Sequence, residues 1–158
     1  MICASHFIEY DGQLCNVHDI ANARPHDKEN MLRHYWDKIG RAAGTGMFNW
    51  MAHLDLPKKT ACGREECWVH AEQFAMNAIA KSKTPIEINT SFYERSHSEP
   101  YPSPRILKMA ARDNVPVLLS DDAHCAEHIG RHFIQAYDLA VSCGVHNFMT
   151  AADAIKSR

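Results

Sequence analysis

The chain has 158 residues and a mass of 17.9 kDa, which fits a single domain over residues 1–158. Hydrophobic residues make up 46% and charged residues 23% of the sequence, so a disordered or fibrous protein is excluded. The net charge of −2 gives no basic footprint for nucleic acid, and no apolar run approaches the roughly 20 residues of a membrane span. Eleven histidines are present, and this enrichment points towards metal or proton chemistry.

The N-terminus and the cysteines both favour a cytoplasmic protein. Residues 1–10 contain His6 and Glu9 and have no basic segment, so they do not resemble a signal peptide. The six cysteines, without an export signal, are typical of reduced cytosolic thiols and not of a disulfide framework.

Short apolar runs alternate with amphipathic segments along the chain. In chain order, we expect a strand at 2–6, a polar loop at 9–27, a helix at 28–43, a strand at 48–53, a helix at 65–81, a strand at 85–89, a helix from the N-cap Ser103 to about 113, a strand at 115–119, a helix at 126–143 and a short strand at 147–149. Strands alternating with helices imply right-handed β-α-β units and a mainly parallel sheet.

The expected helix at 126–143 has apolar residues at helical spacing, and Gly144 ends it. We expect these residues to face the core: Ile129, Phe133, Tyr137, Ala140 and Val141.

Polar side chains follow several of the expected strands. These residues are His6, His53, Glu87 with Asn89, and the cluster Asp121, Asp122 and His124. Because α/β folds gather functional groups at the carboxyl ends of their strands, we expect these side chains to meet at one edge of the sheet.

The segment Asp122-Ala-His124 directly follows an apolar strand. In an extended segment, residues two apart point the same way, so a carboxylate and an imidazole would face one site. Such mixed ligands suit Zn, Mn or Fe. Alternatively, Asp122 caps the following helix while His124 is exposed, and His6 and His53 are hydrogen-bonded, partly buried histidines.

Two further sets of residues have weaker patterns. His124, His128 and His132 are four residues apart and would line one helical face, although His128 and His132 lie at the edge of its buried stripe. Three arginines near strand ends or helix starts could pair with a phosphate, or be solvated surface charges: Arg95, Arg105 and Arg131.

Several blocks in order resemble one known family. They are Ala4-Ser5-His6-Phe7, the block HLDLPKK at 53–59, EINTS at 87–91, and EPYPSP at 99–104 leading to SDDAH at 120–124. Together they resemble the polymerase-and-histidinol-phosphatase (PHP) metallohydrolases, closest to the histidinol-phosphatase branch, over residues 2 to about 145.

The resemblance implies a distorted, seven-stranded, TIM-like β/α barrel with up to three Zn, Mn or Fe ions, and cleavage of histidinol phosphate in histidine biosynthesis. It implies that His6 and His53 bind one metal, that Asp122 binds a second, and that His124 binds a third. The ions would activate water and neutralise charge on the phosphate.

The substrate side of the expected site follows from the same resemblance. Asn89 and the loop that includes Arg95 resemble the region that shapes the substrate pocket, and Arg95 or Arg131 would orient the phosphate of a small phosphorylated metabolite.

The chain also departs from the family pattern. The N-terminal H-x-D/H-x-H motif, a further His and a bridging Glu have no counterpart, so the chain resembles the C-terminal portion of the family. We therefore expect a partial barrel lacking its first strands, an open sheet edge that could pair in a homo-oligomer, and weak or no activity of this chain alone. The alternatives are another PHP-type phosphoesterase or nuclease, and an inactive remnant that needs a partner for the missing strands.

Overall fold

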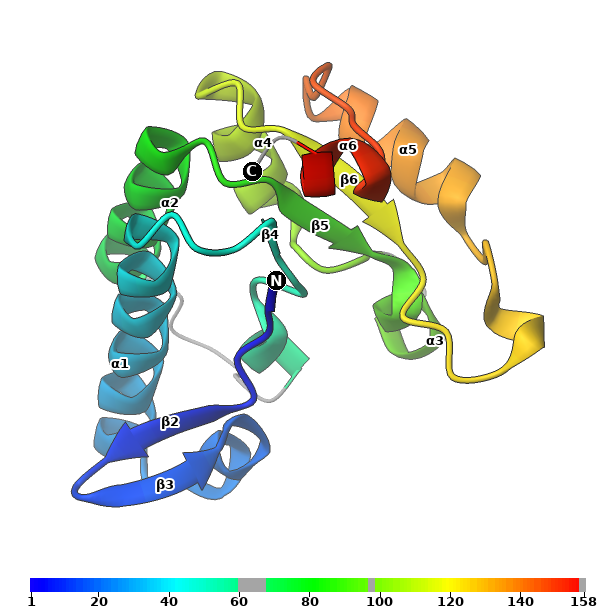
Figure 1. Ribbon diagram of the computed structural model, residues 1–158. Helices are drawn as coiled ribbons and strands as arrows, with labels where there is room; N and C mark the ends of the chain where they lie inside the picture. Colours follow the sequence, from blue (N-terminus) through cyan, green and yellow to red (C-terminus); the bar gives the residue numbers. More distant parts are fainter. Residues whose placement is uncertain (60–67, 97–98, 157–158) are drawn as a thin grey trace.

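The computed structural model describes residues 1–59, 68–96 and 99–156. Its main sheet contains four parallel strands in the order β1 (Ile2–Cys3), β4 (Trp50–Met51), β5 (Ile86–Asn89) and β6 (Val117–Ser120) (Figure 1). This order follows the chain, and helices separate the last three strands. The expected α/β class with a parallel sheet is therefore confirmed, whereas the partial, TIM-like barrel stays a prediction.

The helices expected at 28–43, 65–81 and 103–113 are found close to those positions. The longer helices are α1 (Pro25–Gly44), α2 (Val69–Ser82), α4 (Pro104–Arg112) and α5 (Phe133–Ser142), and the shorter ones are α3 (Tyr93–Ser96) and α6 (Ala151–Lys156). The described residues also contain the 3-10 turns η1 (Val17–Asn22), η2 (Leu56–Lys59), η4 (Thr90–Phe92) and η5 (Ala126–His128). Residues 65–67 of the helix expected at 65–81 lie outside the described residues. Within the described part, no helix combines the length and apolar character needed to cross a membrane.

Helix α1 begins earlier than expected because Pro25 occupies its first turn, where a missing N–H costs nothing. Its buried stripe includes Leu32, Tyr35 and Trp36, and α1 packs against α2 (Figure 1). Gly40 allows the close approach, since a Cβ there would lie 3.2 Å from the Cα of Ala75.

The loop expected at 9–27 is wrong over most of its length. It contains most of an antiparallel hairpin, β2 (Phe7–Tyr10) and β3 (Gln13–Asn16), followed by η1 and the first turn of α1. Asp11 and Gly12 form the two-residue turn, with φ of 54° and 72°. Two positive φ values match the right-handed twist of the strands, which is why Asp-Gly favours this turn.

The strands expected at 2–6 and 48–53 are longer than those observed. Strand β1 ends at Cys3 and β4 at Met51, and His53 has a φ of 28° that is incompatible with a continuing strand. His6 and His53 therefore belong to the loops beyond the carboxyl ends of β1 and β4. The strand expected at 147–149 is a single parallel bridge between Phe148 and Val117.

The continuous helix expected at 126–143 is also wrong. Only η5 forms at its start, and α5 begins at Phe133. The backbone between them has positive φ at Gly130 (76°) and His132 (58°), values that a right-handed helix cannot contain. His124, His128 and His132 therefore do not share one helical face.

Helix α5 also presents a different face to the core. Its buried residues are Ala136 and Ala140, whereas Tyr137 is 47% and Val141 38% exposed, and Ile129 before the helix is 74% exposed. Of the five residues expected to face the core, Ala140 is the one that is buried. Helix α5 therefore packs against the core through small side chains.

Candidate active site

A cavity of about 500 Å³ lies at the carboxyl ends of the sheet strands and gathers most of the predicted site residues. Its walls come from the loops after β1, β4 and β6 and from α3, η1 and η5. The lining includes six predicted residues: His6, His53, Arg95, Asp122, His124 and Arg131. Residues from opposite ends of the sequence are therefore brought to one hollow.

His6 and His53 form the most closely associated pair. Their ring centroids are 4.9 Å apart and the rings meet edge to face at 69°. His53 is 7% exposed, and its backbone N–H donates to Oε2 of Glu87 at 2.7 Å. The carbonyl of His6 accepts from the Val17 N–H at 2.9 Å, which joins this loop to η1. Both imidazoles are thus fixed through their backbones.

The buried carboxyl group of Glu87 supports the loop that carries His53. Burial raises the pKa of Glu87, and the hydrogen bond from the His53 N–H opposes that shift. A second donor, Nδ2 of Asn89, lies 3.4 Å from the same oxygen.

Asn89 is fully buried and acts on the loop that follows it. Its side-chain oxygen accepts from the backbone N–H of Ser91 at 3.0 Å and from its hydroxyl at 2.6 Å. The expected contribution of Asn89 to the pocket is therefore an ordering of the backbone that leads to Arg95, since a 0% exposed side chain cannot meet a ligand directly.

Asp122 and His124 lie in the loop after β6, and both are exposed. Asp122 has a φ of 50°, so the segment turns and the expected extended arrangement is wrong. The turn places Nδ1 of His124 2.8 Å from the carbonyl oxygen of Asp122. Asp121 stabilises this loop, because its carboxylate accepts from the N–H groups of Ala123 and Gly130.

Metal binding requires several ligands to converge on one point. In residues 1–59, 68–96 and 99–156, no three His, Cys, Asp or Glu side chains are arranged so that they could hold an ion. The described side chains do not complete a metal site, so ligation by His6, His53, Asp122 and His124 stays a prediction.

Arg131 is the most buried cation of the cavity, with 13% of its side chain exposed. One terminal nitrogen donates to the carbonyl of Asp121 at 3.3 Å, and the other lies 3.8 Å from Oε1 of Glu94. Its buried Nε has no hydrogen-bond partner in the part of the chain that the structure describes. Arg95 lies on α3 and is exposed, so the two guanidinium groups reach the cavity from different elements.

Glu94 lies beside these arginines and joins α3 to the start of α5. Nε2 of His132 lies 3.0 Å from its Oε1, and this hydrogen bond lowers the pKa of Glu94. The third arginine considered above, Arg105, pairs with Glu72 in another cavity and does not line this one.

Several residues of the cavity were not assigned to it from sequence: His18, His128, Tyr101 and Glu94. His18 lies on η1, directly after the β2–β3 hairpin that turns the chain. The Asp-Gly pair at 11–12 was the available signal for that turn. Tyr101 is positioned by an antiparallel bridge to Asn89, and its buried hydroxyl has a raised pKa because of desolvation.

Known proteins resemble this chain in sequence and in fold. No protein-family model matches the chain. A probable histidinol-phosphatase of Deinococcus radiodurans is 29% identical over 121 residues, which are 77% of this chain and 46% of that protein. The fold is similar to the crystal structure of the putative histidinol phosphatase hisK from Listeria monocytogenes, with a TM-score of 0.66, 17% identity, and coverage of 85% of this chain and 56% of that one. The chain thus spans about half the length of these relatives, and its resemblance to histidinol-phosphatases is confirmed over that half.

Proposed function

We propose that the chain contributes the phosphate-binding part of a phosphomonoester hydrolase that acts on histidinol phosphate. The supporting observation is the cavity at the strand ends, where Arg95 and Arg131 line the same hollow as the predicted ligands His6, His53 and Asp122. The names of the two relatives support the hydrolase class. Histidinol phosphate is the substrate class that follows from those names.

Arg131 is the principal phosphate anchor in this proposal. A guanidinium group binds a phosphate through two parallel N–H···O bonds, and its strength increases where water is excluded. The Arg131 side chain is largely buried and lines the cavity, and its contacts with the Asp121 carbonyl and with Glu94 hold the guanidinium group in place. Arg95, which is exposed, would approach the same phosphate from the solvent side.

The histidines that line the same cavity would also act on the phosphate. Neutral imidazoles accept protons from a water molecule or bind a metal, and protonated ones donate to phosphate oxygens. The Zn, Mn or Fe dependence implied by the family resemblance belongs to this proposal. Its direct test is the metal content of the purified chain after dialysis against each ion, compared with a His53→Gln variant.

Binding of inorganic phosphate, followed by calorimetry, tests the anchor. We expect Arg131→Lys to weaken phosphate binding roughly 10- to 150-fold, because a hydrogen bond to a charged group contributes about 1.5–3 kcal/mol. The matched control is Arg112→Lys, since Arg112 lies on α4 and pairs with Asp113 away from the cavity. Equal phosphate affinities in the two variants would contradict the assignment.

Release of phosphate from histidinol phosphate tests the reaction itself. We expect turnover that rises with added Mn, Zn or Fe and falls in Arg131→Lys. If the chain binds phosphate but releases none from histidinol phosphate under any metal condition, it is a binding half and not a hydrolase by itself.

A further inference from the structure

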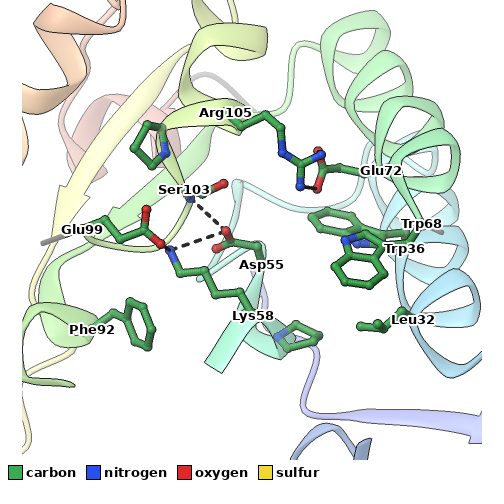
Figure 2. Close-up of a pocket in the computed structure, with 12 residues that line it drawn as sticks. Leu32, Trp36, Asp55, Lys58, Trp68, Glu72, Phe92, Glu99, Ser103 and Arg105 are labelled. Carbon is green, nitrogen blue, oxygen red and sulfur yellow. Dashed lines mark hydrogen bonds and ion pairs between the residues drawn. The ribbon is translucent and has the colours of Figure 1, made fainter. Parts of the chain in front are cut away.

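A second cavity of about 330 Å³ lies between α1, α2, η2 and the start of α4. Figure 2 shows its side chains, with Asp55 between Lys58 and Glu99 on one side and Trp36 and Trp68 on the other. The cavity shares one wall residue, Phe92, with the candidate active site. None of the residues assigned to phosphate or metal binding above lines it.

Large apolar side chains form one wall of this cavity. Trp36 of α1 and Trp68 before α2 are 2% and 8% exposed, and Leu32 lies one helical turn before Trp36. Indole rings bind organic cations through their π faces and bind apolar groups through their large area. This wall favours a ligand with an apolar body.

Asp55 supplies a buried carboxylate on the opposite wall. Only 6% of its side chain is exposed. Oδ2 accepts from the backbone N–H of Ser103 at 2.8 Å and lies 3.5 Å from Nζ of Lys58. Oδ1 is also buried, and no group in the described chain donates a hydrogen bond to it. A buried carboxylate oxygen without a donor is costly, and a ligand donor would remove that cost.

The remaining charged groups are arranged in pairs. Arg105 contacts Glu72 through two nitrogens, at 2.8 and 2.9 Å, and Nζ of Lys58 lies 3.2 Å from Oε1 of Glu99. The described lining therefore contains three carboxylates, with Asp55, and two cations. Among the described lining residues, carboxylates outnumber cations, which favours a cationic ligand over an anionic one.

We propose that this cavity binds a small organic cation: a primary ammonium group directed at Asp55 with an apolar body against Trp36 and Trp68. The Asp55 carboxylate would accept one N–H of the ammonium group, and the indole rings would contact the positive charge and the carbon atoms next to it. The proposal does not depend on phosphate binding in the neighbouring cavity.

Titration with 2-phenylethylammonium, followed by tryptophan fluorescence, tests this site. Two of the three tryptophans line the cavity, so a bound ligand changes their emission. We expect a saturable change, and at least tenfold weaker binding of 2-phenylethanol, which has the same body without the charge. Asp55→Asn should reduce the preference for the ammonium compound to less than threefold, while Asp27→Asn, which changes a carboxylate of α1 outside the cavity, should leave it unchanged.

A second variant guards against a folding defect, because Asp55 also holds the start of α4 through Ser103. Trp68→Leu does not alter the groups of Ser103 and Lys58 that contact Asp55. It should weaken binding of the ammonium compound at least fivefold, with the fluorescence of Trp36 as the reporter. It should leave the affinity for inorganic phosphate unchanged, which separates this site from the proposed phosphatase site. No saturable change up to 10 mM of the probe (roughly the limit of a specific small-ligand site), or equal affinity for the alcohol, would overturn the proposal.

Discussion

The hydroxyl of Tyr35 connects the core of α1 to the segment that carries His53 and Asp55. It donates to the carbonyl of Leu54 at 2.9 Å, and both Tyr35 and Leu54 are fully buried. Tyr35→Phe removes the donor and keeps the ring, so the Leu54 carbonyl is left in a site without water.

The expected cost follows from that burial. A buried acceptor that loses its partner destabilises a protein by about 1–3 kcal/mol. For a chain of this size, 1 kcal/mol lowers the melting temperature by about 2–4 °C, so the variant should melt roughly 2–12 °C below the parent.

Urea denaturation measures the corresponding difference in the free energy of unfolding. The matched control is Tyr137→Phe, because the Tyr137 ring on α5 is 47% exposed and loss of its hydroxyl should change the free energy of unfolding by less than about 0.5 kcal/mol. If Tyr35→Phe is as stable as this control, the carbonyl finds another donor and the reasoning about the loop is refuted.

Three further predictions concern the turns and the rim of the candidate site. Gly12→Ala should destabilise the hairpin by about 1–2 kcal/mol because its φ is 72°, while Gly44→Ala at the end of α1 should stabilise by about 0.4–1 kcal/mol; thermal melts measure both. The lowered pKa of Glu94 gives a stabilisation that is present above about pH 4.5 and is lost as the pH falls through the folded-state pKa. Glu94→Gln should remove this pH dependence of the free energy of unfolding in denaturation curves. An NMR titration of the His132→Gln variant should show a higher pKa for Glu94. Asp121→Ala removes the acceptor for the Gly130 N–H, so its amide hydrogen exchange should accelerate roughly fivefold.

Local sequence patterns predicted the elements with strong, uninterrupted signals. Helix α4 follows an N-cap Ser103 and a Pro in its first turn. Of the apolar stripe that the spacing predicts, Ile106, Leu107 and Ala110 are buried in the core and Ala111 is partly buried. Strand β5 alternates Ile86 and Ile88 with Glu87 and Asn89, and all four residues are buried, as is typical of a strand inside a parallel sheet.

The errors lie where backbone conformation depends on one or two residues. The hairpin turn at 11–12 and the left-handed residues at 130 and 132 each reverse the chain locally without changing the average hydrophobicity of their segment. Periodicity averages over ten or more residues, so it does not register such positions. His18 was missed for this reason, because its place in the cavity follows from the hairpin before η1.

Prediction of the site was less sensitive to these errors than prediction of the strands. His6 and His53 line the cavity although β1 and β4 stop two or three residues before them, because the parallel order still directs each following loop to the same edge. The expectation that polar residues meet at one edge of the sheet depends on the strand order and not on the length of each strand.

The break before α5, unlike the strand lengths, matters for the site, because it decides which side chains reach the cavity. In a continuous helix from residue 126, the side chains of Arg131 and His132 would point about 100° apart around the helix axis. Instead, the left-handed residues at 130 and 132 bury Arg131 against the Asp121 carbonyl and send His132 to Glu94. The guanidinium group on which the phosphate proposal depends is therefore placed by backbone geometry that no apolar pattern encodes. Asp121 is the side chain that connects this geometry to the loop of Asp122 and His124.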